Sequence, residues 1–272
     1  MLLLLSFYVS YSIHLVKNAL KATNLLNIFD KKDYIARNIC QRMFLRELIS
    51  VVFPNYCSGC GCVLMRKEAF LCVFCRNQLP ETRFHSFLNN PLMKKFYGRC
   101  DLYGATSLLY FHKEGVVQKL IHQLKYKGNE QIGAWLGSWL GEKLSDEAVF
   151  RQTQVVVPVP LHPEKERLRG YNQVALFGKQ LAQKLQAEYV DDVLVKIRAN
   201  TSQTRKNLFQ RVVNSQNIFS VKNPEKIMHK RVLLVDDLIT TGATVESCYR
   251  ELTQEEGVKM GVVSMAYANK ED

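Results

Sequence analysis

The sequence lacks the features of a membrane-spanning or secreted protein. Its apolar stretch at residues 1–16 is shorter than the ~20 residues that a spanning helix needs, and it contains Ser, Tyr and His. No basic residue precedes Lys17 and no convincing cleavage site follows, whereas a secretory signal needs both. Internal repeats and low-complexity segments are also absent. We therefore expect a cytoplasmic protein with no stable membrane insertion.

Residues 1–42 are interpreted as an extension with no fold of its own. Between the apolar stretch and Met43 the segment is polar and irregular, and an amphipathic run, MFLRELISVVFP, begins at Met43. We expect Met43, or a residue near it, to be the natural start of the protein. Membrane anchoring by the extension is the alternative.

Acidic side chains are outnumbered by basic ones up to residue 231. Residues 161–231 carry 14 basic and six acidic groups, whereas residues 232–272 carry three and eight, and the formal net charge is +12. This basic excess suits either a polyphosphate substrate or a nucleic-acid surface. A merely solvated basic face is the third interpretation.

Four of the eight cysteines form two closely spaced pairs. Cys57 and Cys60 make one C-x2-C knuckle, and Cys72 and Cys75 make another, 11 residues further on. Four thiolates so spaced make a tetrahedral site that suits a structural Zn²⁺, which implies a reducing cytosol. Cys62 could substitute for one of these four ligands, but the two C-x2-C pairs already supply four thiolates without it. A redox disulfide is the weaker interpretation, because one C-x2-C would suffice for it.

From residue 101 onward, apolar runs alternate with helical spacing. This alternation predicts a mainly parallel sheet flanked by helices, in which ligands bind at the carboxyl ends of the strands. The expected strands are 103–111, 155–160, 190–197, 231–237 and 258–268, with helices at 116–124, 132–144, 172–185 and after residue 244. Residues 76–100 read as a polar linker, and residues 161–173 as a flexible basic loop.

The stretch RVLLVDDLITTGATV, residues 231–245, organises this pattern. An apolar strand ends in Asp236 and Asp237, and a small hydroxyl-rich loop, Thr240-Thr241-Gly242-Ala243-Thr244, leads into a helix. N–H groups at a helix N-terminus suit a phosphate, and the acceptor-only acids suit the hydroxyls of an attached sugar. It is not a Walker loop, because the Gly-Lys-Ser/Thr ending is absent. A strand and turn with no ligand is the alternative that the chemistry alone leaves open.

The whole string closely resembles the phosphoribosyl pyrophosphate (PRPP) motif of type I phosphoribosyltransferases. From about Met43 to Ala268 the chain is similar to the ComF family of ComFC/GntX-like competence proteins. The segments that carry this resemblance are the zinc knuckles, LKYKG at 124–128, VVPVPLHP at 156–163, RLRGYNQ at 167–173, the spaced residues Gln203, Thr204, Leu208, Arg211, Asn214 and Phe219, and VLLVDDLITTGAT.

The resemblance implies an α/β fold with a type I phosphoribosyltransferase sheet at 101–272, a linker at 81–100, and a helix with a zinc-ribbon-like segment of four cysteines at 43–80. It implies that Asp236 and Asp237 bind the ribose hydroxyls, while Thr240, Thr241, Gly242, Ala243 and Thr244 hold the 5-phosphate. Arg167 and Arg169 would neutralise the pyrophosphate, which carries Mg²⁺.

Two functions follow from this resemblance. One is a competence protein that binds PRPP or a related ribose phosphate and helps to handle incoming single-stranded DNA, together with other competence proteins. The alternative is an active phosphoribosyltransferase in nucleotide salvage, whose acceptor the sequence does not identify. Because a fold does not fix a function, the sequence leaves catalysis open.

Overall fold

The structure is a computed structural model that describes residues 54–197 and 218–269. The chain divides into two units, Met1–Tyr56 and Cys57–Asp272, and every element below belongs to the second. The extension at 1–42, the run that begins at Met43 and most of the basic segment 198–219 lie outside the described residues. Within the described ranges, none of the helices combines the length and the apolar character needed to cross a membrane.

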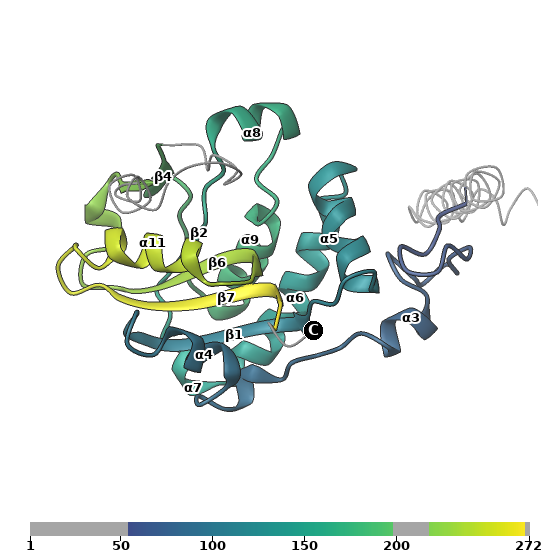
Figure 1. Ribbon diagram of the computed structural model, residues 1–272, viewed down its shortest axis with the longest axis horizontal. Helices are drawn as coiled ribbons and strands as arrows, with labels where there is room; N and C mark the ends of the chain where they lie inside the picture. Colours follow the sequence, from purple (N-terminus) through teal and green to yellow (C-terminus); the bar gives the residue numbers. More distant parts are fainter. Residues whose placement is uncertain (1–53, 198–217, 270–272) are drawn as a thin grey trace, which may run out of the picture. The chain divides into compact units, whose positions relative to one another are not determined.

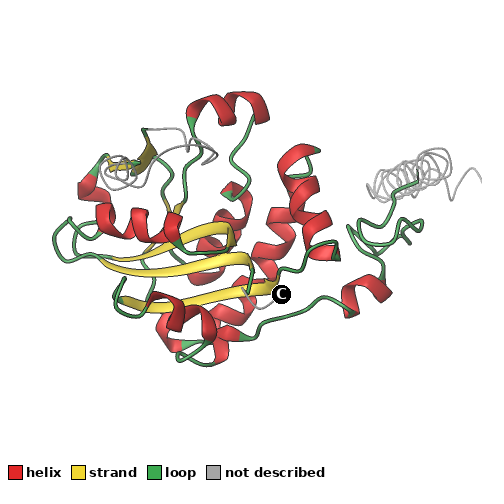
Figure 2. Ribbon diagram, in the orientation of Figure 1, coloured by secondary structure: helices red, strands yellow, loops and turns green. Residues whose placement is uncertain are grey.

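Five parallel strands form the main sheet, as the sequence predicts (Figure 1 and Figure 2). Their order is β1-β7-β6-β2-β3. Strands of such a sheet are covered on both faces and therefore read as near-continuous apolar runs; Val232 to Val235, for example, are completely buried. The strands are β1 Leu102–Tyr110, β2 Val155–Pro158, β3 Glu188–Tyr189, β6 Arg231–Ile239 and β7 Lys259–Tyr267.

Helices cover both faces of the sheet. One apolar core contains residues of α5 Val116–Tyr126, α6 Gln131–Ser145, α7 Ala148–Arg151 and α9 Ala175–Leu185. The other core contains residues of α4 Pro91–Phe96 and α11 Ala243–Leu252. Figure 1 shows α4 and α11 on the near side of the strands, with α6 and α9 behind them.

Glycines let α6 and α9 pack closely together. A Cβ on Gly137 would stand 2.6 Å from the carbonyl oxygen of Phe177, and one on Gly141 would stand 2.9 Å from the Lys184 side chain. This four-residue spacing places both glycines on one face of α6. The close packing fixes α9, and with it Gln173 just ahead of the helix.

The connections reverse direction between β2 and β6. β2 leads through α9 to β3 at one edge of the sheet, whereas β6 leads through α11 to β7 in the other direction, with the two helices on opposite faces. Such a reversal opens a crevice at the carboxyl ends of the two strands, where ligands of these folds bind. The crevice is flanked by Val159 and by the residues that follow Val235.

Residues 81–100, which the sequence predicts as a linker, are packed onto the sheet. They contain a 3₁₀ helix, Phe84–Ser86, and the helix α4, and they bury Phe84, Leu92 and Phe96. The buried amide of Asn90 caps α4 through Met93 N–H and donates to the carbonyl of Ala105 in β1 at 2.8 Å. Pro91 is the first residue of the helix, a position that tolerates proline, so here it does not mark a linker.

Two other expectations change in detail. The expected basic loop at 161–173 contains a helix, α8 Pro163–Arg169, which ends at Gly170 with φ +83°. Of the expected strand at 190–197, only β4 Leu194–Lys196 is formed, because the chain bends at residues 191–193, and β3 ends before this range at Tyr189. β4 pairs antiparallel with β5 Phe219–Val221 in a separate two-stranded sheet. The remaining elements are α3 Val73–Asn77 and a 3₁₀ turn, Pro224–Lys226.

Candidate functional site

The two adjacent carboxylates of β6, those of Asp236 and Asp237, lie on opposite faces of the sheet. Successive side chains of a strand alternate between faces; Leu234 lies in the core beneath α4 and α11, and Val235 lies in the core beneath α5 and α9. Asp236 therefore faces α11 and Asp237 faces α5. Both carboxylates are largely buried, with 9% and 5% of the residue exposed, and the strand continues beyond them to Ile239.

Asp237 is held by partners from two other segments. Lys125, near the end of α5, places Nζ 2.9 Å from Oδ2, and Gln173 donates to the same oxygen at 2.7 Å. Arg169, at the end of α8, donates in turn to Oε1 of Gln173. Two motifs of the sequence thus meet at Asp237: Lys125 comes from LKYKG and Gln173 from RLRGYNQ. Sequence reasoning had assigned no partner to either residue.

Asp236 is the more isolated of the two acids. Its Oδ1 accepts the N–H of Asp237 at 2.8 Å. Burial, together with the neighbouring charge of Asp237, raises the pKa of Asp236 to about 7, although Lys125 and Lys196 act in the opposite sense. At neutral pH this carboxyl is therefore balanced between donating and accepting a hydrogen bond, and it can bind a sugar hydroxyl in either form.

The hydroxyl-rich loop joins β6 to α11 at the carboxyl edge of the sheet. Thr240, Thr241 and Ala243 are exposed, so the loop is open to a ligand. Gly242 has φ +83°, and a Cβ there would stand 2.7 Å from the Phe96 ring, so both the turn and the packing require glycine. The loop ends at the N-terminus of α11, whose N–H groups and dipole favour an anion.

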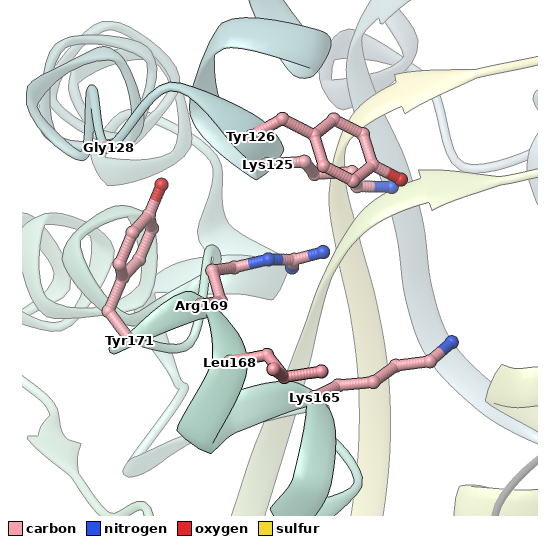
Figure 3. Close-up of a pocket in the computed structure, with 7 residues that line it drawn as sticks. All are labelled: Lys125, Tyr126, Gly128, Lys165, Leu168, Arg169 and Tyr171. Atoms are coloured by element: carbon pink, nitrogen blue, oxygen red, sulfur yellow. The ribbon is translucent and has the colours of Figure 1, made fainter.

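A pocket of about 330 Å³ lies beside Asp237 (Figure 3). Its residues come from the end of α5 and from α8 and the turn that follows: Lys125, Tyr126, Gly128, Lys165, Leu168, Arg169 and Tyr171. Figure 3 shows the cationic ends of Lys125, Lys165 and Arg169 directed toward the same side of the pocket. The Arg169 guanidinium lies over the Tyr126 ring, 5.6 Å from its centroid. Three cations and two aromatic rings suit a phosphorylated or aromatic ligand.

The structure separates the two arginines that the sequence nominated. Arg169 lines the pocket and connects to Asp237 through Gln173. Arg167 is exposed on α8 and is not among the residues that line the pocket. Lys165, which sequence reasoning did not single out, lines the pocket together with Arg169.

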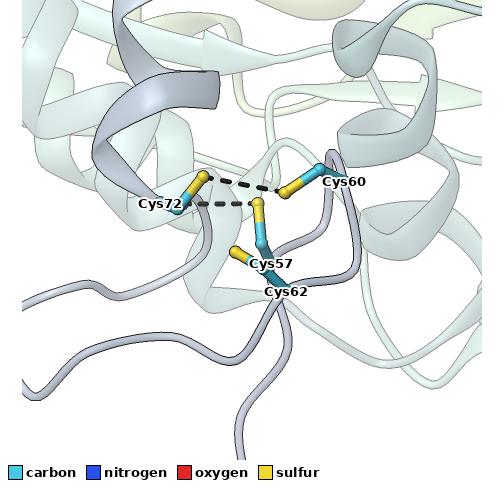
Figure 4. A group of neighbouring side chains, drawn as sticks. All are labelled: Cys57, Cys60, Cys62 and Cys72. Carbon is cyan, nitrogen blue, oxygen red and sulfur yellow. Dashed lines mark hydrogen bonds between the residues drawn. The ribbon is translucent and has the colours of Figure 1, made fainter.

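The cysteine segment gathers its thiols in one place (Figure 4). The sulfurs of Cys57, Cys60, Cys62 and Cys72 all lie within 4.8 Å of one another, and Cys60 Sγ is 3.7 Å from Cys72 Sγ. Sulfurs bound at ~2.3 Å to a tetrahedral zinc stand about 3.8 Å apart. The group therefore has the composition and spacing of a metal site, although it contains Cys62 in place of Cys75.

Cys75 lies against the same group. Its thiol interacts with those of Cys57, Cys60 and Cys72, and a Cβ on Gly59 would stand 2.8 Å from its sulfur. Cys75 is buried, whereas Cys62 is exposed. Five cysteines are thus gathered in this segment, and four of them are the residues that the C-x2-C spacing nominated.

Backbone donors prepare part of this group for metal binding. The N–H groups of Gly59 and Cys72 donate to Cys57 Sγ at 3.4 and 3.3 Å, and that of Cys75 donates to Cys72 Sγ at 3.4 Å. Burial opposes ionisation of Cys57, but these and further hydrogen bonds outweigh it and lower its pKa to about 6. Because the thiolate is the form that binds metal, this favours loading near neutral pH.

Comparison with known proteins matches the sheet to one domain family. The phosphoribosyl transferase domain profile matches residues 174–271, which include β6, the 240–244 loop and α11. A solved adenine phosphoribosyltransferase is 16% identical with a TM-score of 0.31, covering 54% of this chain and 74% of that one.

Two curated relatives share part of the sequence. Competence protein F of Haemophilus influenzae is 32% identical over 107 residues, which are 38% of this chain and 47% of that protein. DNA utilization protein YhgH of Salmonella typhimurium is 30% identical over 129 residues, which are 46% of this chain and 56% of that protein. The chain thus spans about half the length of the relatives it matches. The chain is thus similar to the ComF/YhgH competence and DNA utilization proteins, at about 30% identity over roughly half of each relative, and the phosphoribosyl transferase domain profile matches its C-terminal part.

Proposed function

We propose that the crevice binds PRPP. Asp236 and Asp237 would hold the ribose hydroxyls, and the loop Thr240, Thr241, Gly242, Ala243 and Thr244 would hold the 5-phosphate. The observation that carries the proposal is the pair of buried acids immediately before an open, glycine-containing loop at the N-terminus of α11, within the matched domain. The two carboxylates can accept hydrogen bonds from the ribose diol, and the loop that follows them can donate hydrogen bonds to the phosphate. A ribose 5-phosphate carries both of these groups.

The basic pocket would bind the pyrophosphate end of the same ligand. Lys125 belongs both to the pocket and to the environment of Asp237, so the pocket adjoins the ribose position. Arg169 supplies a guanidinium that matches phosphate geometry, and Lys165 adds a point charge. Arg167, being exposed on α8, would act at longer range on the approaching anion.

The donor set is compatible with a magnesium-bound pyrophosphate. Mg²⁺ prefers carboxylate oxygens, waters and substrate phosphates, and Asp237 is joined to the cation-lined pocket through Lys125. When bound with the ligand, Mg²⁺ would neutralise part of the pyrophosphate charge. The chain's own contribution is to orient the sugar through the two acids. The charge of Asp237 would also favour positive charge on the ring if transfer takes place.

The cysteine segment is proposed to hold a structural Zn²⁺ through Cys57, Cys60, Cys72 and Cys75. A closed site buried from water is typical of structural zinc, and this favours buried Cys75 over exposed Cys62 as the fourth ligand. Thiolates kept for metal require a reducing compartment, so we place the protein in the cytoplasm.

The names of the relatives suggest the biological setting. Because these relatives are named for competence and for DNA utilization, we infer a role in DNA handling, and we propose incoming single-stranded DNA as the form that is handled. The second candidate function is phosphoribosyl transfer to an acceptor base. It is favoured by Tyr126 and Tyr171, whose rings line the pocket next to the proposed ribose position.

Calorimetry of the zinc-loaded full chain with PRPP and Mg²⁺ tests the proposal. We expect saturable binding by the wild type and none by the variant Asp236→Asn with Asp237→Asn, which keeps the shape of both side chains. A variant in a remote ion pair, Lys226→Met, should bind as the wild type does, since that lysine pairs with Asp192 outside the crevice. A folded wild type without PRPP binding would refute the proposal. Pyrophosphate release upon addition of candidate bases would support the second function.

A further inference from the structure

α4 and the turn after it lie against the loop that we assign to the 5-phosphate. Lys95 Nζ donates to the carbonyl of Thr240 at 2.6 Å, and Arg99 Nη2 donates to the carbonyl of Thr241 at 3.3 Å. Phe96, between them in sequence, packs on Gly242. Two cations from a segment about 145 residues earlier thus bind two successive peptide oxygens of the loop.

These contacts determine where the N–H groups of the loop point. In a planar trans peptide the C=O and the N–H point in opposite directions, and the described chain has no cis peptide bond. The N–H groups of Thr241 and Gly242 therefore point away from Lys95 and Arg99. Across residues 54–197 and 218–269, no protein group accepts a hydrogen bond from either N–H. Two adjacent donors are thus left for a ligand on the side opposite α4.

The two cations also change the charge of the loop. A positive charge on a peptide oxygen polarises the peptide and strengthens its N–H as a donor. Glu246, in the first turn of α11, would repel a phosphate, but Arg99 Nη1 lies 3.2 Å from it and Arg250 lies 2.5 Å from it. Arg99 therefore has two effects: it polarises the peptide of Thr241 and it neutralises the charge of Glu246.

We propose that Lys95 and Arg99 are positioning residues for the 5-phosphate, whose binding they promote without touching it. They fix and polarise the two peptides whose N–H groups receive the anion. The inference rests on the proposed ribose 5-phosphate site and deepens it. Both residues lie outside the matched segment 174–271, so α4 completes a site that the matched domain supplies only in part.

Calorimetry of the full chain with three ligands tests this role: PRPP, ribose 5-phosphate and inorganic pyrophosphate, each with Mg²⁺. Lys95→Met keeps the length of the side chain and removes its charge, and Lys95→Gln keeps a donor for the Thr240 carbonyl. We expect Lys95→Met to weaken PRPP and ribose 5-phosphate about tenfold each, the loss of one charge-assisted hydrogen bond, and to leave pyrophosphate unchanged. Lys95→Gln should fall between Lys95→Met and the wild type. Lys94→Met on the same helix is the matched control, because Lys94 is exposed.

The pH dependence of binding separates this role from mere stabilisation of the fold. A phosphate monoester becomes a dianion near pH 6, so ribose 5-phosphate should bind the wild type more tightly at pH 7.5 than at pH 5.5. The gain should be smaller in Lys95→Met, because the lost charge favours the dianion. Equal weakening of all three ligands, or unchanged binding in both Lys95 variants, would overturn the positioning role alone. A wild type that binds neither PRPP nor ribose 5-phosphate would instead overturn the proposed function, and the positioning role with it.

Discussion

The ammonium of Lys125 bridges both oxygens of Asp237, at 2.9 Å from Oδ2 and 3.0 Å from Oδ1. The lysine comes from the end of α5 and the acid from β6, which are 112 residues apart in the sequence. The pair therefore connects the basic pocket to the acids of the crevice. It gives Asp237 a cationic partner, whereas the neighbouring Asp236 titrates near neutrality.

Removing this lysine should weaken the fold as well as the site. Lys125→Met removes the cation from a carboxylate that is 5% exposed and leaves it the hydrogen bond from Gln173. We expect the free energy of unfolding to fall by about 1.5–3 kcal/mol, the range for a hydrogen bond to a charged group. Urea denaturation measures this change. Lys127→Met, two residues on and exposed, is the control and should change stability by less than about 0.5 kcal/mol.

The pH dependence of stability should report Asp236. Its pKa rises from 3.8 to about 7 on folding, so between these values the folded state binds more protons than the unfolded state. Stability from this group is then fully present below pH 3.8 and is lost progressively as pH rises to about 7. The loss is on the order of 4 kcal/mol at most, because one unit corresponds to about 1.4 kcal/mol.

Asp236→Asn removes the titration and keeps the shape. The free energy of unfolding of the wild type, minus that of the variant, should therefore decrease between about pH 4.5 and about pH 7.5. A difference that stays constant across this range would show that Asp236 titrates as an ordinary exposed acid.

The sheet and the phosphate loop could be predicted because their signals are local. A run such as Val232–Val235 is buried on both faces, so it is apolar throughout, and the residues after it form one contiguous motif. The partners of Asp237 could not be predicted from spacing. Lys125 and Gln173 stand in two separate motifs, and only the packing of α5 and α9 on one face of the sheet brings them together.

α4 escaped prediction for a related reason. Its segment, residues 81–100, is polar, contains Pro91, and has only Leu92 and Phe96 as fully buried side chains in the helix. The amide of Asn90 secures it to β1, and a single side chain of this kind leaves no periodic signal. A helix of six residues is marginal by itself, and packing on the sheet and on the 240–242 loop stabilises α4.

The fourth zinc ligand can be decided by paired substitutions. Cys75→Ser should lose the metal, because it removes the buried thiol of the second knuckle. Cys62→Ser should retain it, because Cys62 is exposed and outside both knuckles. Zinc content of the purified proteins, by atomic absorption, gives the answer, with Cys100→Ser as a control for a buried cysteine elsewhere in the fold. The reverse result would make Cys62 the ligand, in agreement with the 4.8 Å group of sulfurs.

Chelation should separate the zinc segment from the crevice. Metal binding supplies much of the folding free energy of so small a segment. Removing zinc with a chelator should therefore lower the thermal midpoint and expose the segment to protease. Cleavage confined to residues 57–79, with the sheet left intact, is the expected pattern. A chelator-resistant midpoint in zinc-loaded protein would contradict a structural role for the metal.

The last prediction concerns Gly242, where conformation and packing act together. Both Gly242 and Gly128 have positive φ, +83° and +69°, but a Cβ at Gly128 meets nothing within 4 Å. Gly128→Ala should therefore cost about 1 kcal/mol of backbone strain alone. Gly242→Ala should cost more and should abolish PRPP binding, because its Cβ would push on the Phe96 ring. Adding Phe96→Leu should restore part of the stability lost in Gly242→Ala. The smaller side chain relieves the contact with the new Cβ, whereas the backbone strain of the positive φ at residue 242 remains. If both alanine variants lose the same stability, the packing of α4 on the loop makes no contribution to folding.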